Sequence, residues 1–182
     1  MLSLVGDSEG SLAGGSVVVW VRVAGWMIAD GEVPVPSRGD VLSDLGVRFR
    51  GEVAAAASEA SDGIEEFRQD SAPSEVIYRA TGRASEARDF YFEIDPGVRD
   101  HATDFVLAVG PVRYQVQSTG WAADVPEGAR LTVTGQASVI GSYEWDDFGL
   151  ADVRGDWQVT GVASSGEEDI LLDLQPTVHD GP

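Results

Sequence analysis

Apolar and polar residues alternate with a period of two along most of this chain, and this pattern constrains its fold more than any other feature. Val19, Val21 and Val23 alternate with Trp20 and Arg22, and successive side chains of a strand point to opposite faces of a sheet. The same alternation recurs in residues 90–95, 112–117, 130–134, 156–160 and 170–174. Each stretch therefore predicts a strand with one face on a core and the other in water, as in antiparallel sheets.

Glycine and proline separate these stretches, for example at Pro96-Gly97 and Gly110-Pro111. Many short strands with regular turn signals are typical of sandwiches and barrels. The predicted fold class is all-β: a small antiparallel barrel or barrels, OB-like or SH3-like, with at most one short helix. That helix is expected near 58–69, because Ala60, Ile64 and Phe67 recur at helical spacing, and Pro73 would end it.

Two β units are predicted, 16–97 and 98–175, between a flexible tail at 1–15 and a flexible end at 176–182. A weak repeat supports the division, since Gly25-Trp26 and Gly120-Trp121 are each followed by Val-Pro, a glycine and an alternating strand. The spacings differ between the two copies. The alternatives are two packed pseudo-repeats or one continuous domain over 16–175.

The charge of the chain is strongly acidic, with 31 acids against 12 bases and a net charge of −19. All the bases are arginine, and neither lysine nor asparagine occurs; this favours a GC-rich genome over a high-salt cytoplasm. Because nucleic acids and anionic membranes attract basic surfaces, we expect no nucleic-acid partner and no membrane partner. Complementary charge favours a cationic surface on any protein partner.

A cytoplasmic location is expected. The first ten residues, MLSLVGDSEG, lack the basic start of a secretory signal. The chain has no cysteine, and hence no disulfide framework. No apolar run approaches the roughly 20 residues that span a bilayer. The oligomeric state cannot be read from the sequence, although exposed edge strands would allow a sheet-extended dimer.

Catalytic motifs are absent from the sequence, and no catalytic residue and no cofactor are predicted. His101 lies beside Asp100, which could orient an imidazole for general-base work. No nucleophile partner can be identified for it, and an exposed loop histidine after Pro96-Gly97 is the favoured interpretation.

An acidic cluster gives the weak candidates for a metal site, Asp146, Asp147 and Asp152. Hard cations prefer clustered oxygen ligands. The spacing does not match a calcium loop, and in so acidic a chain such clusters arise by chance. No metal is therefore predicted.

Three tryptophans are the candidate ligand-binding residues: Trp20, Trp26 and Trp121. Trp20 lies on the strand face opposite Val19 and Val21, whereas Trp26 and Trp121 adjoin glycines at strand ends, where binding loops emerge. Tryptophan in a small barrel is either core or a platform for a ligand.

The opening of the chain resembles an uncharacterised family of actinobacterial proteins. The resemblance rests on Trp20, Trp26, Gly31, Pro34 and Gly39-Asp40, and on the later stretch 147–162, which contains Asp156-Trp157. The family often has paired cysteines where this chain has Ile28-Ala29, and the N-terminal tail is additional. The resemblance implies a small β-barrel of unknown function and supplies no site residues.

The leading functional prediction is a non-enzymatic intracellular binding or interaction module that recognises a protein or a small ligand. The alternative is a carbohydrate-active or other hydrolase-like enzyme that uses acidic residues near a tryptophan-lined pocket. A third hypothesis is a metal-stabilised β-protein.

Overall fold

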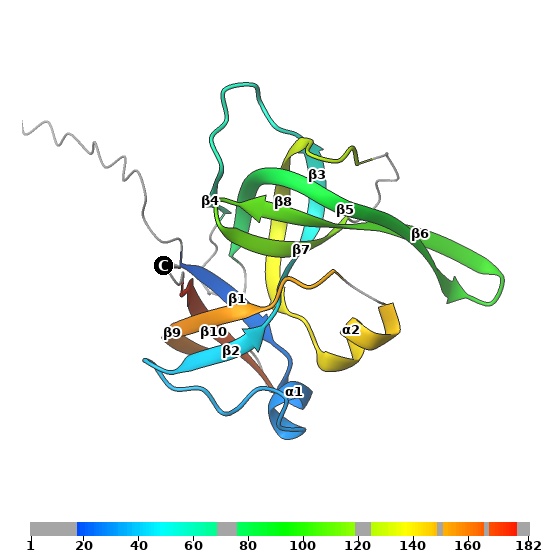
Figure 1. Cartoon of the computed structure of the whole chain (residues 1–182). Helices are drawn as coiled ribbons and strands as arrows, with labels where there is room; N and C mark the ends of the chain where they lie inside the picture. Colours follow the sequence, from blue (N-terminus) through cyan, green and yellow to red (C-terminus); the bar gives the residue numbers. More distant parts are fainter. Residues whose placement is uncertain (1–17, 69–75, 119–124, 149–150, 166–167, 178–182) are drawn as a thin grey trace, which may run out of the picture.

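The computed structural model describes residues 18–68, 76–118, 125–148, 151–165 and 168–177, and their strands form one ten-stranded sheet (Figure 1). The strands are β1 (Val19–Val23), β2 (Val41–Leu45), β3 (Val47–Ala55), β4 (Gly63–Arg68), β5 (Ile77–Asp95), β6 (Val98–Val109), β7 (Val112–Ser118), β8 (Arg130–Val139), β9 (Gly155–Ser165) and β10 (Asp169–Pro176). Two short helices, α1 (Gly25–Ala29) and α2 (Ser142–Phe148), interrupt them. The predicted mostly-β class is confirmed.

Five of the strands close into a barrel in the order β5-β6-β7-β3-β8, because β8 pairs with β5 as well as with β3. The long strand β5 makes the closure possible: residues 78–83 pair with β8 and residues 83–95 pair with β6. Neighbouring strands are antiparallel except β3 and β7, which run parallel. The predicted small barrel is therefore confirmed, with one parallel pairing.

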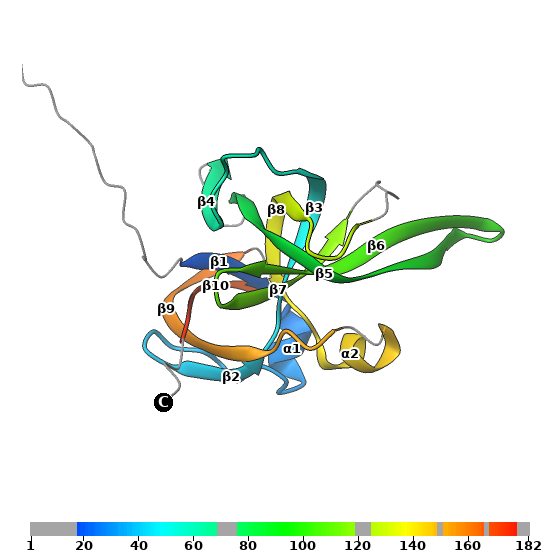
Figure 2. The same cartoon turned by 45° about the horizontal axis from the view of Figure 1, so that its top comes forward.

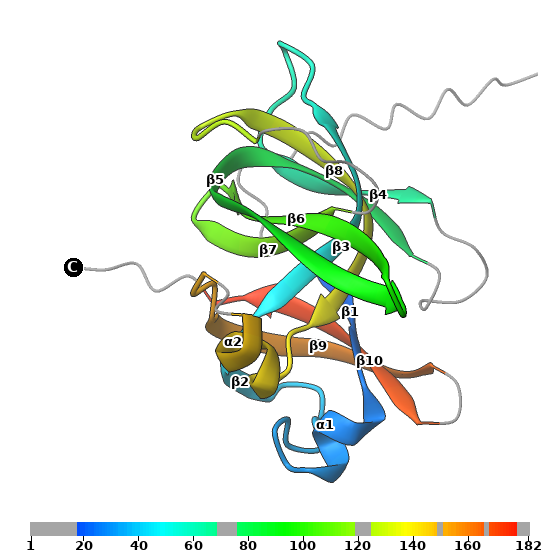
Figure 3. The ribbon, with the colours of Figure 1, turned by 90° about the vertical axis from the view of Figure 1, so that its right-hand side faces the viewer.

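Four further strands extend the barrel on one side, in the order β2-β9-β10-β1 (Figure 3), and β4 pairs with the barrel strand β5. They join it where β1 runs parallel to β8, with Val21 opposite Ala137 and Arg22 opposite Ser138. Strand β8 therefore belongs to both parts of the sheet.

The larger of two hydrophobic clusters in the described residues runs through the barrel and the extension. Four buried aromatic rings link the two parts, with centroid distances of 6.3 Å for Tyr78–Phe49, 5.2 Å for Phe49–Tyr114 and 5.9 Å for Tyr114–Trp157. Trp157 on β9 also donates its indole N–H to the Leu45 carbonyl at 2.9 Å. The barrel and the extension thus bury their apolar side chains against each other.

The predicted helix near 58–69 is wrong, because residues 63–68 form β4 and pair antiparallel with β5. Glu65 forms an ion pair with Arg79, and the Arg79 guanidinium lies 4.0 Å from the centre of the Phe67 ring. These cross-strand contacts outweigh the helical spacing of the apolar residues. The two helices that do form lie at 25–29 and 142–148, where none was predicted, so the limit of one short helix is also wrong.

The β5–β6 hairpin turns at Pro96-Gly97 and projects away from the barrel (Figures 1 and 2). Its turn lies at the predicted boundary between two units, and the barrel takes strands from both sides of that boundary. Residue 101 lies within β6 rather than in the loop that the sequence suggested. At the other end of the chain, Pro176 is the last residue of β10 and Thr177 donates its N–H to the Asp156 carbonyl.

Candidate functional site

Two adjoining hollows follow the seam between β1 and β8, and they share Arg22 and Ser138. We call them together the β1–β8 groove. The larger hollow measures about 390 Å³ and is lined by Trp20, Arg50 and Gln136, among others. The smaller measures about 180 Å³ and is lined by Trp26, Tyr143 and Glu144, among others. A polar floor therefore runs between aromatic side chains at the two ends.

Strand register places the polar side chains of this floor on one face of the sheet. Ser138 on β8 lies opposite Arg22 on β1 and opposite Arg48 on β3. Two residues earlier on β8, Gln136 lies opposite Arg50. The intervening residues, among them Val21 and Phe49, point into the core and are fully buried, so period-two alternation directs the arginines outward.

Trp20 lies on this outer face of β1, with its indole ring over the neighbouring extension of the sheet. A Cβ built on Gly161 of β9 would lie 3.1 Å from the Trp20 ring, so the glycine leaves room for it. The Trp20 backbone N–H donates to the Tyr78 hydroxyl at 2.8 Å. Burial raises the pKa of Tyr78 to about 12, which keeps that hydroxyl neutral.

Trp26 belongs to α1 and forms the other end of the groove. Its ring centroid lies 5.4 Å from that of Tyr143 on α2, and a Cβ on Gly141 would lie 2.7 Å from the indole. Glu32, after α1, accepts hydrogen bonds from the N–H of Ser142 at 2.9 Å and from its hydroxyl at 2.5 Å. Trp26 nevertheless keeps 39% of its surface exposed, and Tyr143 keeps half of its surface exposed.

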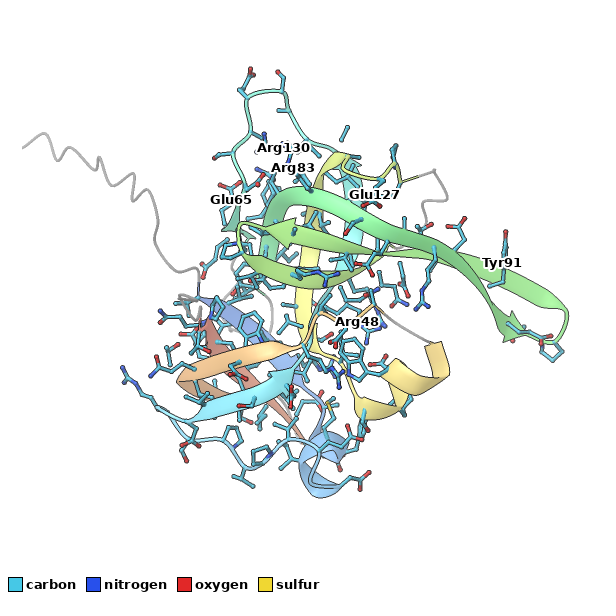
Figure 4. The ribbon with its side chains drawn as sticks, viewed as in Figure 1. Arg48, Glu65, Arg83, Tyr91, Glu127 and Arg130 are labelled. Atoms are coloured by element: carbon cyan, nitrogen blue, oxygen red, sulfur yellow. The ribbon has the colours of Figure 1, made fainter. Side chains whose placement is uncertain are left out.

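Arg22 and Arg48 are each neutralised by a carboxylate. Arg22 pairs with Asp169, which also accepts the Gly25 N–H at 3.0 Å. Burial alone would raise the pKa of Asp169, but the hydrogen bonds from Gly25 and Arg22 hold it below its ordinary value. Arg48 (labelled in Figure 4) donates to Glu144 of α2 at 2.5 Å, and both side chains are almost fully buried.

Arg50 differs from both, because its side chain is hydrogen-bonded to an uncharged partner. Its Nε donates to the Gln117 side-chain oxygen at 2.7 Å. Burial lowers the pKa of Arg50, and the neighbouring positive charge of Arg48 lowers it further. Within the part of the chain that the structure describes, Arg50 forms no ion pair with a carboxylate.

The sequence-predicted site residues fall into three places. Trp20 and Trp26 lie in the same groove, and Trp121 lies outside the described residues. The side chains of Asp146, Asp147 and His101 are likewise not among those that the structure describes. Asp152 is bound by Arg154 through 2.9 Å and 3.0 Å hydrogen bonds, which hold its pKa at about 2. Among the described residues, no group of three His, Asp or Glu side chains could hold a metal ion.

The arginines and Ser138 were missed by sequence reasoning. Arg48 and Arg50 flank Phe49, and this alternation could have placed both on the outer face of a strand. It could not have shown that β1 would lie beside β8, because the residues concerned are more than 100 positions apart.

Comparison with protein-family models, curated proteins and solved structures finds no match for this chain. The resemblance to the actinobacterial family stays a prediction. Neither of the helices in the described residues is long and apolar enough to cross a membrane.

Proposed function

We propose that the protein is a binding module that takes a small ligand in the β1–β8 groove. The observation that carries the proposal is that Trp20 and Trp26 lie at the two ends of one groove whose floor is polar. Ligand sites are typically hollows of roughly 300–1,000 Å³ that combine aromatic walls with a few polar groups, and the larger hollow, at about 390 Å³, falls in this range.

The state of the nearby carboxylates favours binding over the hydrolase-like alternative. Glu144 is bound by Arg48 and by the Gly141 N–H, and Asp169 by Arg22 and the Gly25 N–H. Carboxylates held in this way serve as structural counter-ions rather than as proton donors. Burial raises the pKa of Asp104 to about 6, but Asp104 lies on β6 and lines neither hollow of the groove.

We further propose that the barrel is of the OB type with its strands circularly permuted. An OB barrel closes in the strand order 1-2-3-5-4, and its strand 1 pairs with both strands 2 and 4. Here β5, β6, β7, β8 and β3 would play the parts of strands 1 to 5, with the last strand first in the chain. OB barrels bind ligands on the face of strands 2 and 3, whereas here Val106 of β6 packs against Ile140, Val153 and Trp145. The β1–β8 groove would be a different surface of the same scaffold.

A neutral aromatic probe tests the proposed function. N-phenyl-1-naphthylamine becomes more fluorescent when it leaves water for an apolar site, so a titration gives its affinity. We expect saturable binding to the unaltered chain and at least about fivefold weaker binding to Trp20→Leu and Trp26→Ala.

The matched control is Tyr91→Ala, because Tyr91 is exposed on the projecting hairpin (Figure 4). This variant should bind the probe as the unaltered chain does, and all variants should unfold at similar temperatures. Equal affinity in the two tryptophan variants and the unaltered chain would overturn the proposal.

A further inference from the structure

We infer that the ligand of the β1–β8 groove carries an oxyanion, a carboxylate or a phosphate, and that the Arg50 guanidinium binds it. This inference rests on the proposed function and names the chemical class of the ligand. It also assigns Arg50, rather than the other arginines of this face, as the residue that recognises charge.

The three arginines of the face differ in what already neutralises them. Arg22 is paired with Asp169 and Arg48 with Glu144, and both carboxylates also accept a backbone N–H. Arg50 lines the larger hollow and is bound to the neutral side chain of Gln117. Since a guanidinium has five N–H donors and Gln117 receives the one on Nε, the terminal nitrogens of Arg50 keep donors for a ligand.

The electrostatic surroundings of Arg50 favour an anion over a neutral group. Partial burial and the charge of Arg48 both destabilise its protonated form, and together they outweigh the carboxylates of Glu144 and Asp104, which stabilise it. An anion at the terminal nitrogens would offset both effects, and such charge-assisted hydrogen bonds are about twice as strong as neutral ones. Among the described residues, the charged side chains that line the groove are Arg22, Arg50 and Glu144. Arg22 and Glu144 are paired with Asp169 and Arg48, so Arg50 gives the groove local positive charge on a chain whose net charge is −19.

The setting of Arg50 also limits the ligand to a small molecule. The strongly acidic surface repels long polyanions, whereas a single oxyanion needs only the local field of the groove. Trp20 lines the same hollow as Arg50, so an aromatic or apolar body attached to the anion would have an indole ring beside it. The expected ligand is therefore a small amphipathic acid.

Two probes that differ by one anionic group test the inference. 8-Anilinonaphthalene-1-sulfonate has the ring system of N-phenyl-1-naphthylamine with a sulfonate added. We expect the unaltered chain to bind the sulfonate at least about tenfold more tightly than the neutral probe. Arg50→Gln should abolish this preference, because it weakens the binding of the sulfonate far more than that of the neutral probe, and Arg50→Lys should retain part of it.

The control variant is Arg83→Gln, which removes an exposed arginine from β5 that donates a 3.5 Å hydrogen bond to the Gly128 carbonyl. Arg83→Gln should keep the full preference for the sulfonate. Cooperative thermal unfolding of each variant excludes binding of the probe to a loosened core.

The outcomes separate the inference from the proposed function. If Arg50→Gln keeps the tenfold preference, or if the unaltered chain shows none, the oxyanion site is wrong while neutral-probe binding still supports the groove. If neither probe binds, the proposed function fails as well. Competition by sodium acetate or sodium phosphate at constant ionic strength then tells whether a carboxylate or a phosphate is preferred; competition by neither contradicts the inference.

Discussion

Arg22 and Arg48 lie opposite the same residue, Ser138, from β1 and β3, the two strands that flank this part of β8. The two arginines are 26 positions apart, and each reaches its own carboxylate on a different element, Asp169 on β10 and Glu144 on α2. This arrangement joins the barrel to its extension on the outer face of the sheet, in the place where the groove forms. The predictions below test the contacts that build it.

The Arg48–Glu144 pair should be important for stability because both side chains are almost fully buried. Glu144→Gln would leave the Arg48 guanidinium buried without its counter-ion, and its Nε already has no hydrogen-bond partner. We expect the free energy of unfolding to fall by about 3 kcal/mol in urea denaturation. The control Glu65→Gln, which breaks the exposed pair with Arg79, should cost less than about 1 kcal/mol; equal losses would contradict a special role for the buried pair.

Gly135 should not tolerate a side chain. It lies opposite Gly51 in the antiparallel pairing of β8 with β3, and a Cβ there would collide with the Arg50 carbonyl. We expect Gly135→Ala to lower the free energy of unfolding by at least about 2 kcal/mol. Gly63→Ala is the matched control in another strand, since nothing lies within 4 Å of the position of its Cβ, and thermal unfolding should scarcely change.

The stability of the protein should decrease between pH 4 and pH 6 because of Asp104. Burial raises its pKa from 3.8 to about 6, so the folded chain holds a proton in this range that the unfolded chain releases. The free energy of unfolding therefore falls as pH rises, by at most about 3 kcal/mol in total. Asp104→Asn should flatten this part of the stability profile in urea denaturation.

Asp152→Asn is the companion variant, because the contribution of Asp152 to stability changes with pH in the opposite direction to that of Asp104. The hydrogen bonds from Arg154 hold the pKa of Asp152 at about 2, so any stability it contributes is present above pH 4 and is lost as pH falls toward 2. The slope between pH 4 and pH 6 should persist in this variant. A slope that persists in Asp104→Asn would show that another group causes it.

Trp157 should tie the barrel to the extension. Trp157→Phe removes the hydrogen bond to the Leu45 carbonyl and leaves a cavity beside Tyr114. We expect a loss of about 2–4 kcal/mol of unfolding free energy. Trp26→Phe, at an exposed ring, should cost less than half as much in the same denaturation experiment; a larger loss there than at Trp157 would argue against Trp157 as the link.

Strands could be predicted wherever alternation is strict, as in β1, β7 and β8, because the period of side chains along a strand is a local property. The stretch that became β4 misled the prediction because its apolar spacing suits a helix and only its pairing with β5 makes it a strand. The short helix α1 could not be predicted either: Trp26 was expected at a strand end, but contacts with Gly141 and Tyr143 hold it on a helix.

The sequence by itself determined that the chain folds into alternating strands, which suit a small barrel, and that Trp20 lies on the strand face opposite Val19 and Val21. Only the tertiary structure decided that Trp20, Trp26 and Arg50 share one groove. The physical reason is that local periodicity sets the face on which a side chain lies, whereas the neighbours of that face depend on pairing between distant strands. Residues 21 and 137 are such a pair, and the groove exists because they meet.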